Sequence, residues 1–135
     1  MAEIYQSVAE DEGLSFRTDI QPNIEIQGDK DLLMQMMANL VENAIRHCPT
    51  GTQITIALKN DGAGWKLTVA DTGPGIPAEE YGRVLQRFYR LEQSRTTPGS
   101  GLGLALVKAV AELHDASVTL SDNYPGLRVD IQPAN

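Results

Sequence analysis

Cysteine is nearly absent from this chain, long apolar runs are missing, and basic residues are in the minority. The 135 residues include one cysteine, Cys48, which excludes an internal disulfide and suits a reducing compartment. No Cys/His spacing resembles a zinc site. No run approaches the roughly 18 apolar residues of a membrane span, and the N-terminus lacks the basic and apolar regions of a signal peptide. We therefore expect a cytoplasmic protein.

The charge balance argues against nucleic acid as a partner. The chain has 11 basic and 18 acidic residues, a net charge of −7, whereas phosphate backbones bind to basic faces. Residues 81–101 are the exception, with four arginines against one acid, Glu92. These arginines are Arg83, Arg87, Arg90 and Arg95. A solvated helix face would account for them, but an anion nearby accounts for them better.

Hydrophobic periodicity predicts one α+β domain over residues 1–135. The class is a two-layer α/β sandwich, in which a mixed, mostly antiparallel sheet packs on helices along one face. Asp29 is a plausible N-cap for the most regular helix, which Pro49 ends. The predicted helices span 3–12, 29–47 and 99–114, and the predicted strands span 14–20, 24–27, 52–61, 64–71, 117–122 and 127–132. Residues 78–98 are polar and longer than an ordinary connection.

The stretch DTGPGIP, residues 71–77, follows an apolar strand and allows two interpretations. Asp71 is either a capping residue in a loop or a ligand contact at the end of a strand. A carboxylate accepts hydrogen bonds from an exocyclic amine such as N6 of adenine. Gly73 and Gly75 would then let the backbone come close to the base.

Polar residues also interrupt the edge of the apolar face of the 29–47 helix. Asn39, Asn43 and Arg46 fall within an arc of about 60°. Asparagine is a mediocre helix former, so two of them one turn apart suggest a function, although core backbone could also satisfy both amides. An amide oxygen suits Mg²⁺, and Arg46 could contact the phosphates of the same ligand.

The stretch GSGLGLAL, residues 99–106, places a glycine-rich loop before a helix. Free N–H groups and the helix dipole favour an anion there. Leu104 stands where the dinucleotide fingerprint requires its last glycine, and no Gly-Lys-Ser/Thr of a P-loop occurs. Alone this signal is weak, but together the three stretches suit one nucleoside triphosphate with Mg²⁺.

Four stretches, in order, resemble the motifs of one family. NLVENAIRH (39–47) resembles the N box, DTGPGIP the G1 box, RFYRLEQSR (87–95) the F box and GSGLGLAL the G2 box. The chain thus resembles the catalytic and ATP-binding domain of sensor histidine kinases. That superfamily, with the Bergerat-type fold, also contains DNA gyrase, MutL and the heat-shock chaperone ATPases.

The resemblance implies a role for each matching residue. Asn43 would coordinate Mg²⁺, Asn39 would help to hold the triphosphate, and Asp71 would bind adenine N6. Arg46 would contact phosphate and His47 would lie beside the adenine. Glu42 would act in phosphotransfer, or is equally a solvated acid. The remaining nucleotide contacts that the resemblance implies are Gly73, Gly75, Ile76, Phe88, Arg90, Arg95, Gly99, Ser100, Gly101, Leu102, Gly103 and Leu104. Residues 81–101 would form a lid that is mobile without nucleotide.

Two stretches depart from the family pattern. HDA (114–116) replaces His-Gly-Gly, and NYPGL (123–127) replaces a Gly-x-Gly-Thr-like turn. Both are expected to lie away from the nucleotide. Neither His47 nor His114 has the sequence context of a phosphoacceptor, so the chain is expected to be a module excised from a larger kinase, without self-phosphorylation.

The resemblance implies that the domain passes the γ-phosphate of ATP to a histidine on its own kinase's dimerisation domain. A response regulator would then receive it. The fragment is expected to be monomeric, within a homodimeric parent that can be anchored in the inner membrane. Two alternatives remain: an ATP-binding regulatory module without phosphotransfer, and a gyrase- or MutL-like hydrolase. Hydrolases carry a glutamate where this chain has Asn39, which disfavours the second alternative.

Overall fold

The computed structural model describes residues 13–21, 28–47, 49–60, 62, 64–85 and 103–133. Within these ranges, strands and helices follow the predicted order. The strands are β1 (Ser15–Ile20), β2 (Gln53–Asn60), β3 (Trp65–Asp71), β4 (Ala116–Asp122) and β5 (Leu127–Pro133). The helices are α2 (Lys30–His47), the 3₁₀ turn η1 (Ala78–Glu80), α3 (Tyr81–Val84) and α4 (Gly103–Leu113). The predicted helix 3–12 and strand 24–27 lie outside the described residues.

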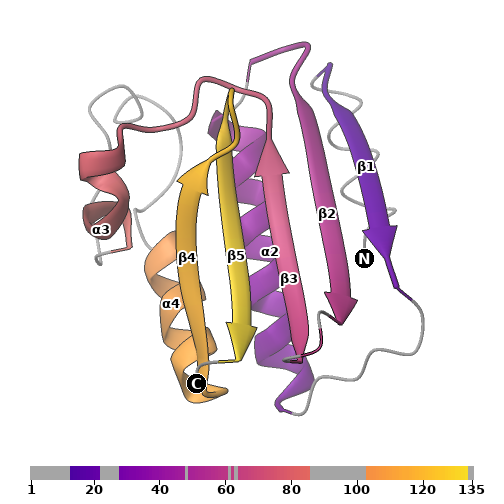
Figure 1. Ribbon diagram of the computed structural model, residues 1–135, viewed down its shortest axis with the longest axis vertical. Helices are drawn as coiled ribbons and strands as arrows, with labels where there is room; N and C mark the ends of the chain where they lie inside the picture. The colour runs from indigo at the N-terminus through magenta and orange to yellow at the C-terminus, as the bar shows by residue number, and fades with distance from the viewer. Residues whose placement is uncertain are drawn as a thin grey trace.

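The five strands form one mixed sheet with the order β1-β2-β3-β5-β4 (Figure 1). β1 pairs with β2 in parallel, and the other three pairings are antiparallel. The parallel pair is joined through α2, since a parallel connection must cross back along the sheet. β3 is the central strand, so its C-terminal end lies between β2 and β5. The predicted fold class, a mostly antiparallel sheet packed on helices, is confirmed.

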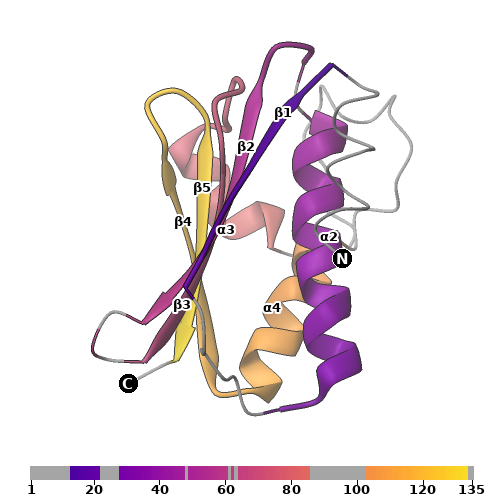
Figure 2. The ribbon, with the colours of Figure 1, turned by 90° about the vertical axis from the view of Figure 1, so that its right-hand side faces the viewer.

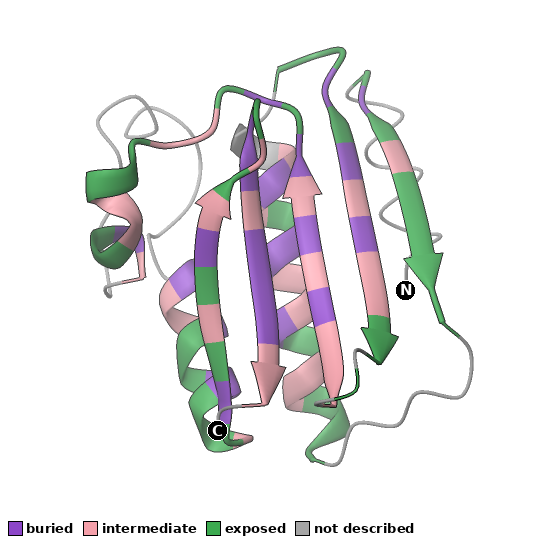
Figure 3. Cartoon of the chain, viewed as in Figure 1, coloured by how far each residue is buried: buried purple, intermediate pink, exposed green. Residues whose placement is uncertain are grey.

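The helices α2 and α4 lie side by side on one face of the sheet (Figure 2). Alternation along the strands explains this layering, because successive side chains point to opposite faces. In β2 the buried residues are Ile54 and Ile56, and in β3 they are Leu67 and Val69. Figure 3 shows this alternation as bands of buried and partly exposed residues. Each such side chain contributes about 1.5–3 kcal/mol through its burial.

The long helix α2 begins and ends where the sequence predicts. Asp29 caps it, because its Oδ1 accepts a hydrogen bond of 3.1 Å from the Leu32 amide. The helix ends at His47, two residues before Pro49. Its core side chains are Met36, Leu40, Val41 and Ala44. No helix in the described ranges is both long and apolar enough to cross a membrane.

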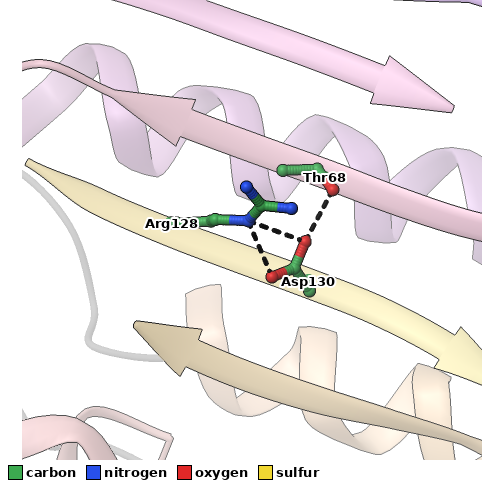
Figure 4. Close-up of polar contacts among 3 residues, drawn as sticks. All are labelled: Thr68, Arg128 and Asp130. Atoms are coloured by element: carbon green, nitrogen blue, oxygen red, sulfur yellow. Dashed lines mark hydrogen bonds and ion pairs between the residues drawn. The ribbon is translucent and has the colours of Figure 1, made fainter. Parts of the chain in front are cut away.

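A polar cluster lies on the opposite face of the sheet. Asp130 of β5 is only 8% exposed there, because neighbouring polar side chains cover it (Figure 4). Arg128 Nε donates to both carboxylate oxygens, at 2.9 and 3.2 Å, and Thr68 Oγ1 donates to Oδ1 at 2.6 Å. The cluster therefore ties β3 to β5 across the middle of the sheet.

Candidate functional site

The candidate site is built around Asp71, the last residue of β3. Leu67, Val69 and Asp71 alternate along the strand, so all three face the helices, and Asp71 is only 7% exposed. A carboxylate on the buried face of a central strand must be hydrogen-bonded there, because burial without partners costs several kcal/mol. The partners of Asp71 therefore define the local geometry.

Both recorded hydrogen bonds to the carboxylate go to one oxygen. Asp71 Oδ1 accepts from the Gly73 amide at 2.9 Å and from the Leu127 amide at 3.3 Å. Neither of these bonds uses the other oxygen, Oδ2. Every buried side-chain oxygen in the described part of the chain has a hydrogen-bond partner, so Oδ2, which has none, is not buried. It is therefore the oxygen left open to a ligand.

The β4–β5 turn, residues 123–127, packs directly behind Asp71. Asn123 Nδ2 donates to the Asp71 carbonyl at 2.7 Å. A Cβ on Gly126 would overlap that carbonyl and lie 2.8 Å from Asp71 Oδ1. The turn thus contacts the predicted site residue Asp71, and the expectation that it lies away from the nucleotide stays a prediction. The sequence indicates a turn at these residues, but Leu127 is 56 positions from Asp71, and no local pattern predicts what the turn contacts.

The loop after Asp71 is fixed by two further contacts. Thr72 exchanges hydrogen bonds with Gln53 of β2, through its amide at 3.1 Å and its hydroxyl at 3.0 Å. Gly75 has a φ of +69°, and a Cβ there would lie 2.9 Å from the Gly126 carbonyl oxygen. Glycine is thus required at position 75 by the packing of the protein itself. Close approach of a base to Gly73 and Gly75 remains a prediction.

The two asparagines of α2 lie at the edge of its buried face, as predicted. Asn39 and Asn43 are half-buried, beside buried Leu40 and Ala44. Glu42 is exposed and forms an interaction within the protein. The predicted site residues Arg46 and His47 belong to α2, but their side chains lie outside the description.

Three other residues predicted to contact the nucleotide lie in the described ranges. Ile76 packs partly buried against the core, Gly103 begins α4 and Leu104 is buried. The remaining predicted contacts lie outside the described residues: Phe88, Arg90, Arg95, Gly99, Ser100, Gly101 and Leu102. The described part of the site therefore consists of the end of β3, its loop, α2 and the first turn of α4.

The donor set limits the metals that this site could hold. The described ranges contain no group of three His, Cys, Asp or Glu residues that could hold an ion. A tightly caged metal is thus not built from these side chains. Asn39 and Asn43 offer amide oxygens, which fit Mg²⁺, because this ion keeps several waters and takes few protein ligands.

Comparison with known proteins identifies relatives for most of the chain. Residues 28–133 match the family described as histidine kinase-, DNA gyrase B-, and HSP90-like ATPase. The sensor-like histidine kinase SenX3 of Mycobacterium tuberculosis is 41% identical over 116 residues, which is 84% of this chain and 28% of that protein. The chain thus spans less than a third of this relative's length.

Solved structures agree with the sequence comparison. The mycobacterial sensor histidine kinase MprB is 30% identical, with a TM-score of 0.81 over 96% of this chain and 85% of that one. The catalytic domain of histidine kinase ThkA, in a nucleotide-free form, has a TM-score of 0.83 over 96% of this chain and 85% of that one. ThkA is only 19% identical, so that likeness shows the fold alone.

Proposed function

Since the chain belongs to the histidine kinase-, DNA gyrase B- and HSP90-like ATPase family, we propose that it binds ATP with Mg²⁺ and donates the γ-phosphate to a histidine. That histidine would stand on a separate dimerisation domain of the parent kinase. A response regulator would be the final acceptor. The similarity to SenX3 and MprB supports this reading over the other activities of the family.

The single observation that carries the proposal is the environment of Asp71. Its Oδ1 is occupied by two backbone amides, and its Oδ2 is left for a ligand. An ionised carboxylate only accepts hydrogen bonds, so the group that binds it must be a donor. The exocyclic amine of adenine is such a donor, and Asp71 would recognise it directly.

The amide side chains of α2 would serve the other end of the nucleotide. Asn43 would hold Mg²⁺ through its oxygen, and Asn39 would hold the triphosphate. When bound, Mg²⁺ would neutralise part of the phosphate charge during transfer. Phosphoryl transfer depends mostly on positioning and charge stabilisation, and the protein's part is to fix the nucleotide between α2 and β3.

Hydrolysis of ATP by this site is disfavoured by one residue. A hydrolase needs a general base to take a proton from water, and the position one turn before Asn43 is Asn39, whose amide cannot do so. A regulatory module that binds ATP without transferring phosphate is the second candidate. It shares every binding residue with the kinase and differs only in the outcome of a transfer assay.

Two measurements test the proposal. Calorimetric titration with ATP, with and without Mg²⁺, should detect binding that Mg²⁺ strengthens and that Asp71→Asn weakens. Incubation with labelled ATP and the parent's dimerisation domain should then label a histidine of that domain. Tight binding without transfer would favour the regulatory module. If the wild-type domain does not bind ATP, both the kinase proposal and the regulatory-module proposal are wrong.

A further inference from the structure

We propose that the β4–β5 turn is a positioning element that orients Asp71 and thereby sets the preference for adenine over guanine. This inference rests on the proposed function, because it concerns the same ligand. Its central residue is Asn123, which would touch neither the nucleotide nor the metal and would act through Asp71.

Three contacts of the turn constrain Asp71 from different directions. Asn123 Nδ2 holds the main-chain carbonyl at 2.7 Å, and the Leu127 amide holds Oδ1 at 3.3 Å. Gly126 packs so closely that any side chain there would overlap the same carbonyl. The Gly73 amide completes the arrangement on Oδ1 at 2.9 Å. Backbone and carboxylate are thus fixed together, and the direction of Oδ2 follows from both.

The turn is itself held in place, as a positioning element must be. The Asn123 amide donates to the Gly126 carbonyl at 3.0 Å, and the Tyr124 amide donates to Asp122 Oδ1 at 2.8 Å. β4 and β5 pair along their whole lengths up to the turn, from Ala116↔Pro133 to Asp122↔Leu127. The Asn123 amide group therefore reaches Asp71 from a rigid support.

Orientation matters because adenine and guanine differ at one position. Adenine presents an amine donor to Oδ2, whereas guanine presents a carbonyl oxygen, and two acceptors facing each other stay unpaired. A carboxylate that could rotate away would not face the carbonyl oxygen of guanine and would tolerate that base. The turn prevents this rotation of Asp71, so Asn123 would contribute to selectivity for adenine as well as to affinity.

The test compares Asn123→Ala with a matched control, Asn60→Ala. Asn60 Oδ1 accepts a hydrogen bond of 2.9 Å from the Gly62 amide in the β2–β3 hairpin, which lies at the opposite end of β3 from Asp71. Each variant loses one bond between an asparagine side chain and the main chain. Binding of ATP and GTP is measured for both, together with the wild type and Asp71→Asn. Backbone amide shifts of Gly73 and Leu127 are recorded without nucleotide.

We expect Asn123→Ala to lower the ratio of ATP to GTP affinity by about threefold to tenfold, the effect of one lost hydrogen bond. The Gly73 and Leu127 amide signals should move, while Asn60→Ala leaves both the ratio and these signals unchanged. If Asn123→Ala does not fold, Asn123→Ser is compared instead, because its shorter hydroxyl side chain is a less severe change.

Failure of this inference is distinguishable from failure of the proposed function. If Asp71→Asn lowers the ratio and the Asn123 variant leaves it at the wild-type value, the positioning role is wrong and the adenine site stands. If the wild type binds ATP and GTP equally well, or binds neither, the adenine assignment of Asp71 falls and the positioning role falls with it.

Discussion

The backbone amide of Asp29 donates a hydrogen bond of 3.0 Å to Nε2 of His114. It joins the start of α2 to the residue after α4, which lies 85 positions further along the chain. Because Nε2 accepts from an amide, it carries no proton, so Nδ1 is the donor in its 2.8 Å contact with the Val110 carbonyl. The imidazole thus connects the two helices in its neutral Nδ1–H form.

This connection predicts a large effect of adding one methyl group at Gly28. A Cβ there would overlap the His114 ring, and overpacking of this kind costs about 1–3 kcal/mol. We expect Gly28→Ala to lower the free energy of unfolding in urea by that amount. Gly28 also has a φ of +154°, so the backbone strains an alanine there in addition to the overlap. Gly51→Ala is the control, since Gly51 has a positive φ of +94° but its Cβ would meet nothing within 4 Å. In a His114→Ala background the Gly28 change should lose the overlap part of its cost and keep only the backbone strain; an undiminished cost there would contradict the overlap.

The Asp130 cluster predicts unequal effects for two threonines on one face of the sheet. Thr68 donates to Asp130 at 2.6 Å from β3, and Thr119 pairs with Asp130 from β4 without a hydrogen bond to it in the described structure. Thr68→Val should lower the free energy of unfolding by about 1.5–3 kcal/mol, the cost of a bond to a charged group. Thr119→Val should change it by less than about 0.5 kcal/mol. Equal effects would show that the Thr68 bond adds nothing.

The ion pair between Lys59 and Asp19 predicts that the stability of the fold depends on pH. Lys59 Nζ lies 2.7 Å from Asp19 Oδ2. The hydrogen bond from Lys59, and then the charge of Lys59, lower the pKa of Asp19 from the ordinary value of 3.8, with a smaller effect from Arg17. The folded pKa lies below the unfolded one, so the stabilisation is complete above the unfolded value and is lost as the pH falls through the folded value.

Carboxyl titration by NMR checks this prediction. Lys59→Gln should return the pKa of Asp19 toward its ordinary value, and high salt should act in the same direction because both side chains are more than half exposed. Lys66→Gln is the control, because Lys66 pairs with Lys59 across β2 and β3 and has no part in the shift. If the pKa of Asp19 is unchanged in Lys59→Gln, the ion pair is not the cause of the lowered pKa.

The proposed metal site predicts that Mg²⁺ dependence of ATP binding requires Asn43. Asn43→Ala should reduce the affinity in Mg²⁺ by about tenfold or more, toward the value measured without the ion. Gln35→Ala removes another amide from α2, but from an exposed position, and should leave binding unchanged. Retention of the full Mg²⁺ effect in Asn43→Ala would overturn the metal assignment.

Local patterns were sufficient to predict most of the fold. The spacing of Met36, Leu40 and Ala44 predicts α2, and Asp29 marks its start. Alternation predicts β2 and β3, and the glycines between them predict the hairpin. These features depend on residues that are close in sequence, which is why the sequence alone reveals them.

The surroundings of Asp71 required the tertiary structure. The position of Asp71 after an apolar strand marks it as a candidate, but nothing in the sequence links it to Asn123 or Gly126. The departure of NYPGL from the family pattern gives no sign of this contact with Asp71. The pairing of β3 with β5 brings the turn to the site, and that pairing is a property of the whole sheet.

The same pairing has a consequence for the order in which the protein folds. The β2–β3 and β4–β5 hairpins close short loops, whereas joining β3 to β5 closes a far longer one and costs more chain entropy. Each hairpin can therefore form early and by itself, but neither holds a finished site. Asp71 belongs to one hairpin and Asn123 and Leu127 to the other, so the bonds from Asn123 to the Asp71 carbonyl and from Leu127 to its carboxylate form only when the two hairpins meet. Nucleotide recognition by Asp71 would thus distinguish a completed fold from a chain that has formed only its local parts.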